Sequence, residues 1–225
     1  MKKIILSAFA LLFLFSCSND ETSTPTEEKN QLTHNHHRGC ASHEVLEEQL
    51  RQDPSLAQRM QQIEKFTTEA IRTGKLVNGK IQIPVVVNVL YKTTAENISL
   101  AQIQSQIDVL NKDFNATNSD FNQVPATFSA VKANVGISFV LDAVNRKYVN
   151  KTSWGTNDTI KKTSTKGIAP TSPTTKLNLW VCTIGGGILG YAQFPGGSSA
   201  TDGVVIDSKY LGTTGRTTAP FNKGR

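Results

Sequence analysis

The strongest constraint on the fold is the segment "IQIPVVVNVLY" at residues 81–91. Its β-branched and apolar residues alternate onto one face, which is typical of a strand; they are Ile81, Ile83, Val85, Val87 and Val89. Val86 and Leu90 make the other face partly apolar, so we expect the strand to be covered on both sides. A chain with such a strand must build a core on each face of a sheet.

A helix is predicted directly after this strand, in "SLAQIQSQIDVLNKDFN". Ser99 and Gln102 form a capping-box pattern, and apolar residues then mark one helical face: Leu100, Ile103, Ile107, Leu110 and Phe114. A strand is expected at 135–144, then a long basic loop to about residue 175. Three short strands should follow in "LNLWVC", "ILGYAQF" and "DGVVID". The predicted fold class is α/β (α+β), a twisted mixed sheet with a backing helix.

A small helical hairpin is predicted before the sheet, in residues 43–74. Asp53 and Pro54 provide an N-cap followed by proline at the first helical position. Apolar residues then recur at spacings of three and four, forming one stripe: Leu56, Met60, Ile63, Phe66 and Ala70. Gly74 is expected to end the second helix.

The first 16 residues read as a leader, with a basic start and an apolar run too short to span a bilayer comfortably. Cys17 follows "LFS" directly, which resembles a bacterial lipobox; an ordinary secretory signal with an incidental cysteine is the alternative. The polar, acidic segment after it cannot bury a core, so 17–36 is predicted to be a disordered tether. An acidic stretch at this place also resembles the surface-export signal of Bacteroidetes-type lipoproteins.

The charge pattern argues against nucleic-acid binding. The chain has 24 basic and 18 acidic residues; removal of Lys2 and Lys3 with the leader would leave 22 against 18. No aromatic platform accompanies the basic cluster, so a solvated loop is the better interpretation; the cluster comprises Arg146, Lys147, Lys151, Lys161, Lys162 and Lys166.

Residues for metal or nucleophilic chemistry are sparse. All four histidines lie in "HNHHRGCASH", and a solvated linker is favoured over a zinc site for His34, His36, His37 and His43. Beyond residue 43 there is no histidine and no G-x-S-x-G motif. Cys40 and Cys182 could pair with each other, pair with residues outside this sequence, or stay free.

Six strings in order resemble the M43 zinc metallopeptidases, the cytophagalysins and pappalysins of the metzincin clan. They are "IPVVVNVLY", "IQSQIDVLNKDFN", "GISFVLD", "LNLWVC", "LGYAQFPGG" and "TDGVVID", and the agreement runs from about residue 81 to 225. The resemblance implies a metzincin-like upper subdomain, incomplete here, because the family's H-E-x-x-H helix would come after Gly224-Arg225. It also implies Zn²⁺ with most ligands in that missing part, a zinc-activated water as the nucleophile, and compatibility with Ca²⁺.

The resemblance assigns roles to several residues. It implies that "GYAQF", Gly190, Tyr191, Ala192, Gln193 and Phe194, is an antiparallel edge strand that binds substrate as an added strand. It makes Cys40 a candidate latency ligand of the zinc, against the alternatives of a free cysteine or a disulfide partner, and Cys182 a disulfide partner of the missing region. Arg72, Lys75 and Lys80 are candidate sites of activation cleavage, judged from their position.

These inferences combine into one functional hypothesis. The chain would comprise a lipoprotein signal (1–16), a tether (17–36), a helical pro-segment (37–79) and the N-terminal part of a metallopeptidase domain (80–225). The whole protein would be an exported, lipid-anchored zymogen acting on protein or peptide substrates, as an outer-membrane lipoprotein or at the cell surface or extracellular. The alternative is a non-catalytic truncated or decayed relative that at most binds peptides.

Lipidation gives a direct test. Cells grown with radiolabelled palmitate should label this protein, and Cys17→Ser should abolish the label, because the cysteine sulfur is the acylated atom. Ser16→Ala serves as the control that leaves the sulfur in place. Equal labelling of the Cys17→Ser variant would refute the lipobox interpretation.

Overall fold

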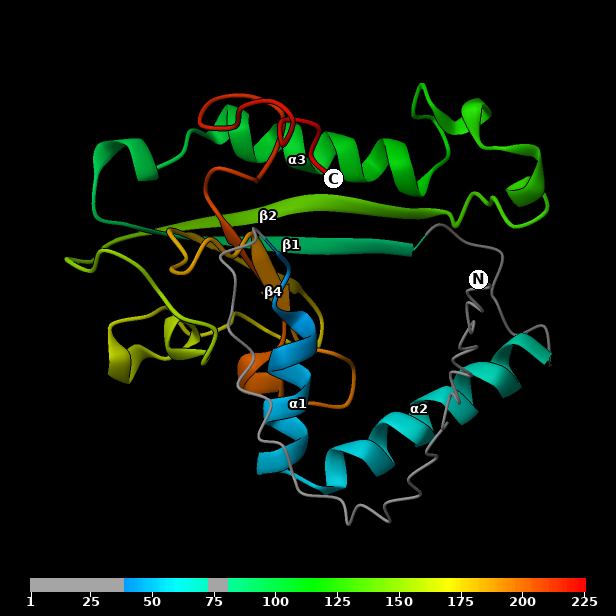
Figure 1. Ribbon diagram of the computed structural model, residues 1–225, viewed down its shortest axis with the longest axis horizontal. Coiled ribbons are helices and arrows are strands. Elements are labelled where there is room, and N and C mark those ends of the chain that lie inside the picture. Colours follow the sequence, from blue (N-terminus) through cyan, green and yellow to red (C-terminus); the bar gives the residue numbers. More distant parts are fainter. Residues whose placement is uncertain (1–38, 73–80) are drawn as a thin grey trace, which may run out of the picture. The chain divides into compact units, whose positions relative to one another are not determined.

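The computed structural model describes residues 39–72 and 81–225, all of which belong to one compact unit, His36–Arg225. Figure 1 shows the arrangement of its elements. The helices are α1 (Ser42–Gln52), α2 (Ser55–Arg72) and α3 (Leu100–Phe114); the strands are β1 (Ile81–Tyr91), β2 (Ile137–Tyr148), β3 (Leu177–Cys182), β4 (Gly190–Ala192) and β5 (Val204–Asp207). No helix in the described ranges is both long enough and apolar enough to cross a membrane.

The five strands form one mixed sheet in the order β2-β1-β3-β5-β4. Neighbours among β2, β1, β3 and β5 are parallel, whereas β4 pairs with β5 in the antiparallel direction. The predicted twisted mixed sheet with a backing helix is confirmed. The sheet therefore ends in a short antiparallel strand on the side opposite β2.

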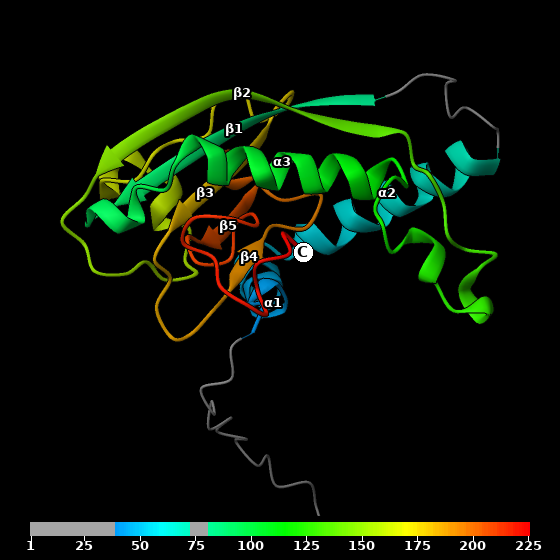
Figure 2. The ribbon, with the colours of Figure 1, turned by 90° about the horizontal axis from the view of Figure 1, so that it is seen from above.

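Each face of the sheet has its own core, because β1 is apolar on both faces. On one face Val85, Val87 and Val89 pack with Ile103 and Ile107 of α3, and Figure 2 shows α3 lying along β1 and β2. The other face carries a second cluster that includes Leu90, Ile160, Trp180, Tyr191 and Val205. The expectation that β1 is covered on both sides is confirmed.

The start of α3 agrees with the sequence only in part. The Ser99 hydroxyl oxygen accepts from the Gln102 N–H at 3.1 Å, as an N-cap should. Gln102 does not complete the capping box: its side chain is buried and donates to the carbonyl oxygens of Ser208 and Leu211, each at 3.0 Å. The capping-box prediction was wrong for Gln102, because its carboxamide binds the backbone of the loop at 208–211 instead of the N-cap residue.

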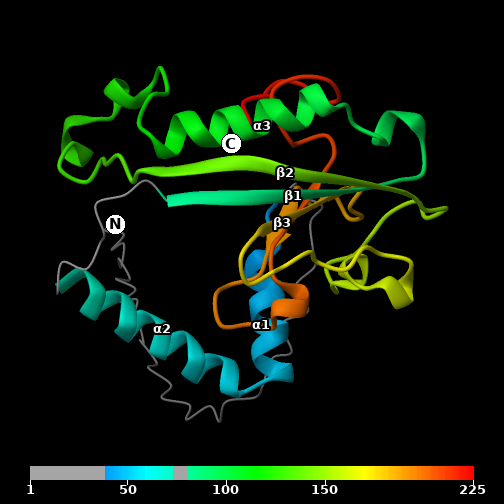
Figure 3. The same ribbon diagram turned by 180° about the vertical axis from the view of Figure 1, so that it is seen from behind.

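Three side chains of α3 hold the segment 208–224 in place. Gln102 also accepts from Arg216 N–H at 2.9 Å, Gln106 accepts from Gly212 N–H at 2.8 Å, and Ser105 accepts from Thr213 N–H at 2.9 Å. Gly212 has φ +82°, and a Cβ there would lie 2.5 Å from Gln102 O and Ser105 Oγ. The Gly/Thr-rich segment is thus an ordered loop fitted against α3, and the chain end lies beside that helix in Figures 1 and 3.

Two other predictions need correction. The apolar stripe of α2 is not packed along its length: Leu56 is 2% exposed, but Ile63 is 37% and Phe66 75% exposed. Lys161, assigned to a solvated basic loop, is 1% exposed. The remaining differences concern strand ends, with β2 reaching Tyr148 and β4 only three residues long.

Replacing Gln102 tests the anchoring of the loop. Gln102→Ala leaves the loop's buried N–H and C=O groups without partners, so we expect the free energy of unfolding to fall by about 2–4 kcal/mol. Gln104→Ala, on the exposed side of the same helix, should change it by less than about 0.5 kcal/mol. Urea denaturation of both variants measures the difference; similar small effects would contradict the anchoring role.

Candidate functional site

The edge strand β4 is the centre of the site. On one side Tyr191 pairs with Val205 of β5, and the flanking backbone bonds join Leu189 O to Asp207 N–H and Gln193 N–H to Gly203 O. On its outer side the strand has backbone groups that β5 does not reach. Such groups are available to an added chain.

Residues Gly39–Ser42 occupy this outer side. The Leu189 N–H donates to Gly39 O at 3.0 Å, and the Ala41 N–H donates to Gly190 O at 3.0 Å. Cys40 and Gly190 form a parallel bridge. Where the chain turns into α1, the Ser42 hydroxyl replaces a carbonyl and accepts from Ala192 N–H at 2.9 Å. A segment of the chain itself is therefore paired with the strand that the sequence analysis assigned to substrate.

Cys40 lies at an apolar cavity of about 530 Å³. The thiol is exposed, and its sulfur lies 3.1 Å from the Ser42 hydroxyl oxygen. The cavity is bounded by α3, by one face of the sheet and by the segment that ends at Arg225; Leu110, Phe114, Leu177, Leu179, Val204, Ile206, Tyr210 and Phe221 are among its lining residues.

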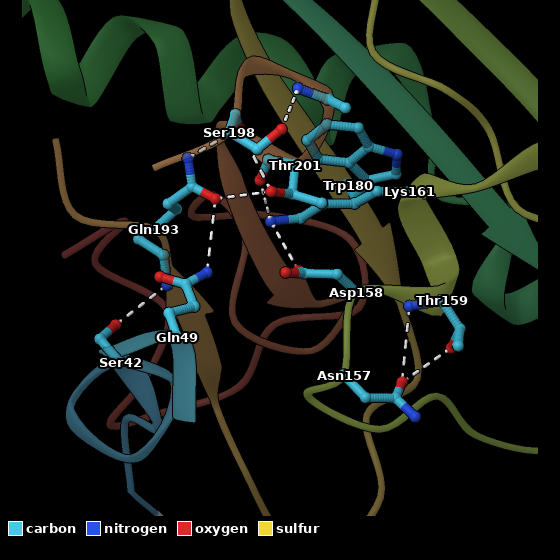
Figure 4. Close-up of polar contacts among 12 residues, drawn as sticks. Ser42, Gln49, Asn157, Asp158, Thr159, Lys161, Trp180, Gln193, Ser198 and Thr201 are labelled. Carbon is cyan, nitrogen blue, oxygen red and sulfur yellow. Dashed lines mark hydrogen bonds and ion pairs between the residues drawn. The ribbon is translucent and has the colours of Figure 1, made fainter. Parts of the chain in front are cut away.

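The inner side of β4 is supported by a buried lysine. The Lys161 ammonium lies 2.9 Å from an oxygen of Asp158 and donates to Thr201 O at 2.6 Å. It also lies over the rings of Trp180 and Tyr191, 5.3 and 5.2 Å from their centroids. Burial lowers the pKa of Lys161, which Asp158 opposes, and burial with the Asp158 charge raises the pKa of Tyr191. Figure 4 shows how Lys161 connects the 158–161 turn to Thr201.

The helical hairpin adds polar contacts to the loop after β4. Gln49 Nε2 donates to Gln193 Oε1 at 3.4 Å. Arg59 donates through Nε to Gly196 O at 2.7 Å and forms an ion pair with Asp53 at 2.6 Å. Gly196 has φ +99°, and a Cβ there would touch the side chains of Leu56, Arg59 and Ile63 at 3.5 Å. The first half of α2 therefore packs closely on this glycine.

The structure does not bring the other predicted residues to this site. Cys182 is fully buried in the core and has no sulfur partner among the described residues, and burial together with Asp207 and Glu96 raises the pKa of its thiol well above the ordinary value. His43 is on the surface of α1, 3.2 Å from Glu47. Arg72 ends α2. Cys17, His34, His36, His37, Lys75 and Lys80 lie outside the described residues.

The described residues do not make a zinc site by themselves. Within 39–72 and 81–225, no three His, Cys, Asp or Glu side chains come close enough to hold a metal ion. Cys40 supplies a soft thiolate donor at the cavity, but a tetrahedral site needs further ligands. The resemblance to zinc enzymes is thus not matched by a donor set in this part of the chain.

Sequence reasoning missed Lys161 and Gln193 as structural partners of β4. Gln193 was named as part of the strand, but it lies just beyond it and acts through its side chain. A lysine beside an aspartate three residues earlier was visible in "DTIK", yet that spacing is equally typical of a solvated pair. Burial by Trp180 and Tyr191 has no local signal in the sequence.

Solved structures of mirolysin and of its precursor, promirolysin, are similar to this chain. Tannerella forsythia promirolysin, as a point mutant, is 34% identical with a TM-score of 0.72, over 83% of this chain and 65% of its own. Mirolysin in complex with compound 9 is 37% identical with a TM-score of 0.62, over 65% and 60%. The chain is related to a metallopeptidase. No protein-family model and no curated protein sequence matches it.

A third mirolysin structure, which contains a peptide, is also similar to this chain. Mature Tannerella forsythia mirolysin, in complex with a cleaved peptide, is 37% identical with a TM-score of 0.63, over 66% of this chain and 60% of its own. The chain spans about 60–65% of the length of these mirolysin structures.

The support from Lys161 can be measured directly. Lys161→Met keeps much of the side-chain volume but leaves Asp158 without its buried partner, so we expect a loss of about 3 kcal/mol in the free energy of unfolding. Lys162→Met removes the same charge from an exposed neighbour and should cost less than about 0.5 kcal/mol. Equal effects in chemical denaturation would show that the buried ion pair does not stabilise the support of β4.

Proposed function

We propose that this chain is the N-terminal portion of a zinc metalloendopeptidase of the M43 type, folded in a latent form. The observation that carries the proposal is the pairing of Gly39–Ser42 with β4 beside the apolar cavity. An extended peptide would use the same groups of β4, so the two are mutually exclusive. Residues 39–72 then act as a pro-segment.

The extent of the mirolysin matches supports this assignment. Promirolysin covers 83% of this chain and mature mirolysin 66%. The difference, 17 percentage points of 225 residues, is about 38 residues. That length suits the predicted pro-segment at 37–79. An activation cut at Arg72, Lys75 or Lys80 would separate it from β1, and N-terminal sequencing of a mature form locates the cut.

The apolar cavity supports a missing part of the same polypeptide. We assign its occupant as a helix that follows residue 225 and carries the H-E-x-x-H zinc ligands. Its apolar face would cover Leu179, Ile206 and Phe221, which line the cavity. Cys40 lines the same cavity, which supports its proposed role as the latency ligand. Cys182 stays a predicted disulfide partner, although a bond to it would have to form inside the core.

A non-catalytic peptide-binding lipoprotein is the second candidate. The observation in its favour is that β4, its support by Lys161 and its outer backbone groups are all complete within the described residues. Under either proposal the chain is exported and attached to the outer membrane or cell surface through Cys17. Calcium remains a proposed additional ion with no assigned ligands.

The gene sequence beyond residue 225 separates the two candidates. We expect an H-E-x-x-H motif within the following codons. A stop codon there, confirmed by resequencing, would refute the enzyme proposal. With the motif present, the full polypeptide should hydrolyse casein after activation, lose the activity to 1,10-phenanthroline and regain it with Zn²⁺. Cys40→Ser removes the thiolate but keeps the pairing of Gly39–Ser42 with β4, so it should show partial activity without processing, whereas Ser42→Thr, which keeps the thiol, should stay latent.

A further inference from the structure

A second, polar pocket lies next to the end of β4. It has a volume of about 260 Å³ and is bounded by Asn157, Asp158, Gln193 and Thr201 on one side and by Gln49 and Arg59 of the helical hairpin on the other. It differs from the apolar cavity in its chemistry, because side-chain amides, a hydroxyl and charged groups line it. Figure 4 shows the polar contacts on which it is built.

The carboxamide of Gln193 is oriented by its own loop. Its Nε2 donates to Ser198 O at 2.9 Å, and its Oε1 accepts from the Thr201 hydroxyl at 2.7 Å. Thr201 is held in turn by Lys161, which donates to its backbone carbonyl at 2.6 Å. A carboxamide oxygen has two lone pairs, so Gln193 presents a fixed acceptor to the pocket.

Gln49 of α1 uses that acceptor incompletely. Its Nε2 lies 3.4 Å from Gln193 Oε1, near the long limit for a hydrogen bond. Its own Oε1 is buried without a hydrogen-bond partner, which is unfavourable for a polar atom. In the place of Gln49, a side chain that only donates, such as lysine or arginine, would have no oxygen left without a partner. A carboxylate in that place would bring one of its oxygens against Gln193 Oε1, where two acceptors repel each other.

An extended peptide can reach the same acceptor by a different route. Gly39–Ser42 leaves β4 at Ala192 because α1 begins there, and within the described part of the helical hairpin Gln49 supplies the hydrogen bond to Gln193. A peptide that continues as a strand beyond Ala192 passes Gln193, the next residue. Its side chains would then compete for the pocket that Gln49 now fills.

We propose that Gln193 and the polar pocket form a side-chain subsite of the β4 site that selects hydrogen-bond donors, with Gln49 as its internal occupant. The proposal rests on the proposed role of β4 as a peptide-binding strand. It predicts a preference for peptides with lysine, arginine or glutamine at the matching position, and discrimination against aspartate and glutamate. Gln193 is a specificity-determining residue in this scheme.

Hydrogen exchange in the full chain tests the subsite without catalysis. The amides to follow are those of Ala41 and Ala192, which join Gly39–Ser42 to β4. Gln49→Glu should speed their exchange about tenfold, the effect of losing one hydrogen bond, whereas Gln49→Lys should leave it within about twofold. Gln62→Glu is the matched control, because Gln62 is exposed on α2 and is not among the residues that line the pocket.

Peptide binding supplies the second arm. In the Gln49→Glu variant, fluorescent peptides with the sequence of residues 39–52 and serine in place of Cys40 should bind β4 in competition with the loosened segment. Peptides with glutamine or lysine at position 49 should have an affinity about fivefold higher than the peptide with glutamate. This factor is smaller than the tenfold that corresponds to a hydrogen bond of about 1.4 kcal/mol.

The outcomes separate the two proposals. Equal exchange in the Gln49→Glu and Gln62→Glu variants, or equal affinity of the three peptides, overturns the subsite and leaves β4 as a peptide-binding strand. If no peptide binds, the peptide-binding role of β4 fails, and with it the function proposed above; the exchange measurement still decides whether Gln193 selects donors.

Discussion

The outward backbone groups of β4 are the constraint on which the rest of the site depends. The sheet has two edge strands, β2 and β4, and of these β4 is antiparallel to its neighbour and lies beside the apolar cavity, where a further chain can pair through its main chain. Gly39–Ser42 takes that place. The position of Cys40 at the apolar cavity, the start of α1 at Ser42 and the reach of Gln49 to Gln193 all follow from this one pairing.

The helical hairpin and the apolar cavity both adjoin β4. The chemistry of the hairpin contacts suits a partner that can be released, and that of the cavity suits a permanent one. The helical hairpin is held by amides, a hydroxyl and the Arg59 guanidinium, with only a few buried apolar residues such as Val45 and Leu56. Polar contacts of this kind exchange for contacts with water at small net cost, so the hairpin can be released. The apolar cavity gains nothing from water and is stabilised only by apolar cover, which suits a permanent partner.

Local pattern was enough to predict most elements. The alternation of apolar residues in β1 and their spacing of three and four in α3 can each be recognised within a short stretch of sequence. Both elements were found where expected. The errors arose where a side chain had two local explanations. Gln102 fits a capping box and also a buried anchor for a distant loop; Lys161 fits a solvated ion pair and also a buried one. Only contacts between residues far apart in the sequence decide between the two explanations, those of Lys161 with Trp180, Tyr191 and Thr201 and those of Gln102 with Ser208 and Leu211.

The sequence by itself determined the strands and the helices, because apolar periodicity and turn residues are properties of the side chains, whereas the antiparallel edge and the candidate thiol were expected from the resemblance to the M43 family. It did not determine what pairs with β4. Main-chain N–H and C=O groups are the same in every residue except proline, so their pattern carries no local signal for a partner some 150 residues away in the chain. That choice was made by the tertiary structure, which brings Gly39–Ser42 within hydrogen-bond distance and turns the chain away at Ser42.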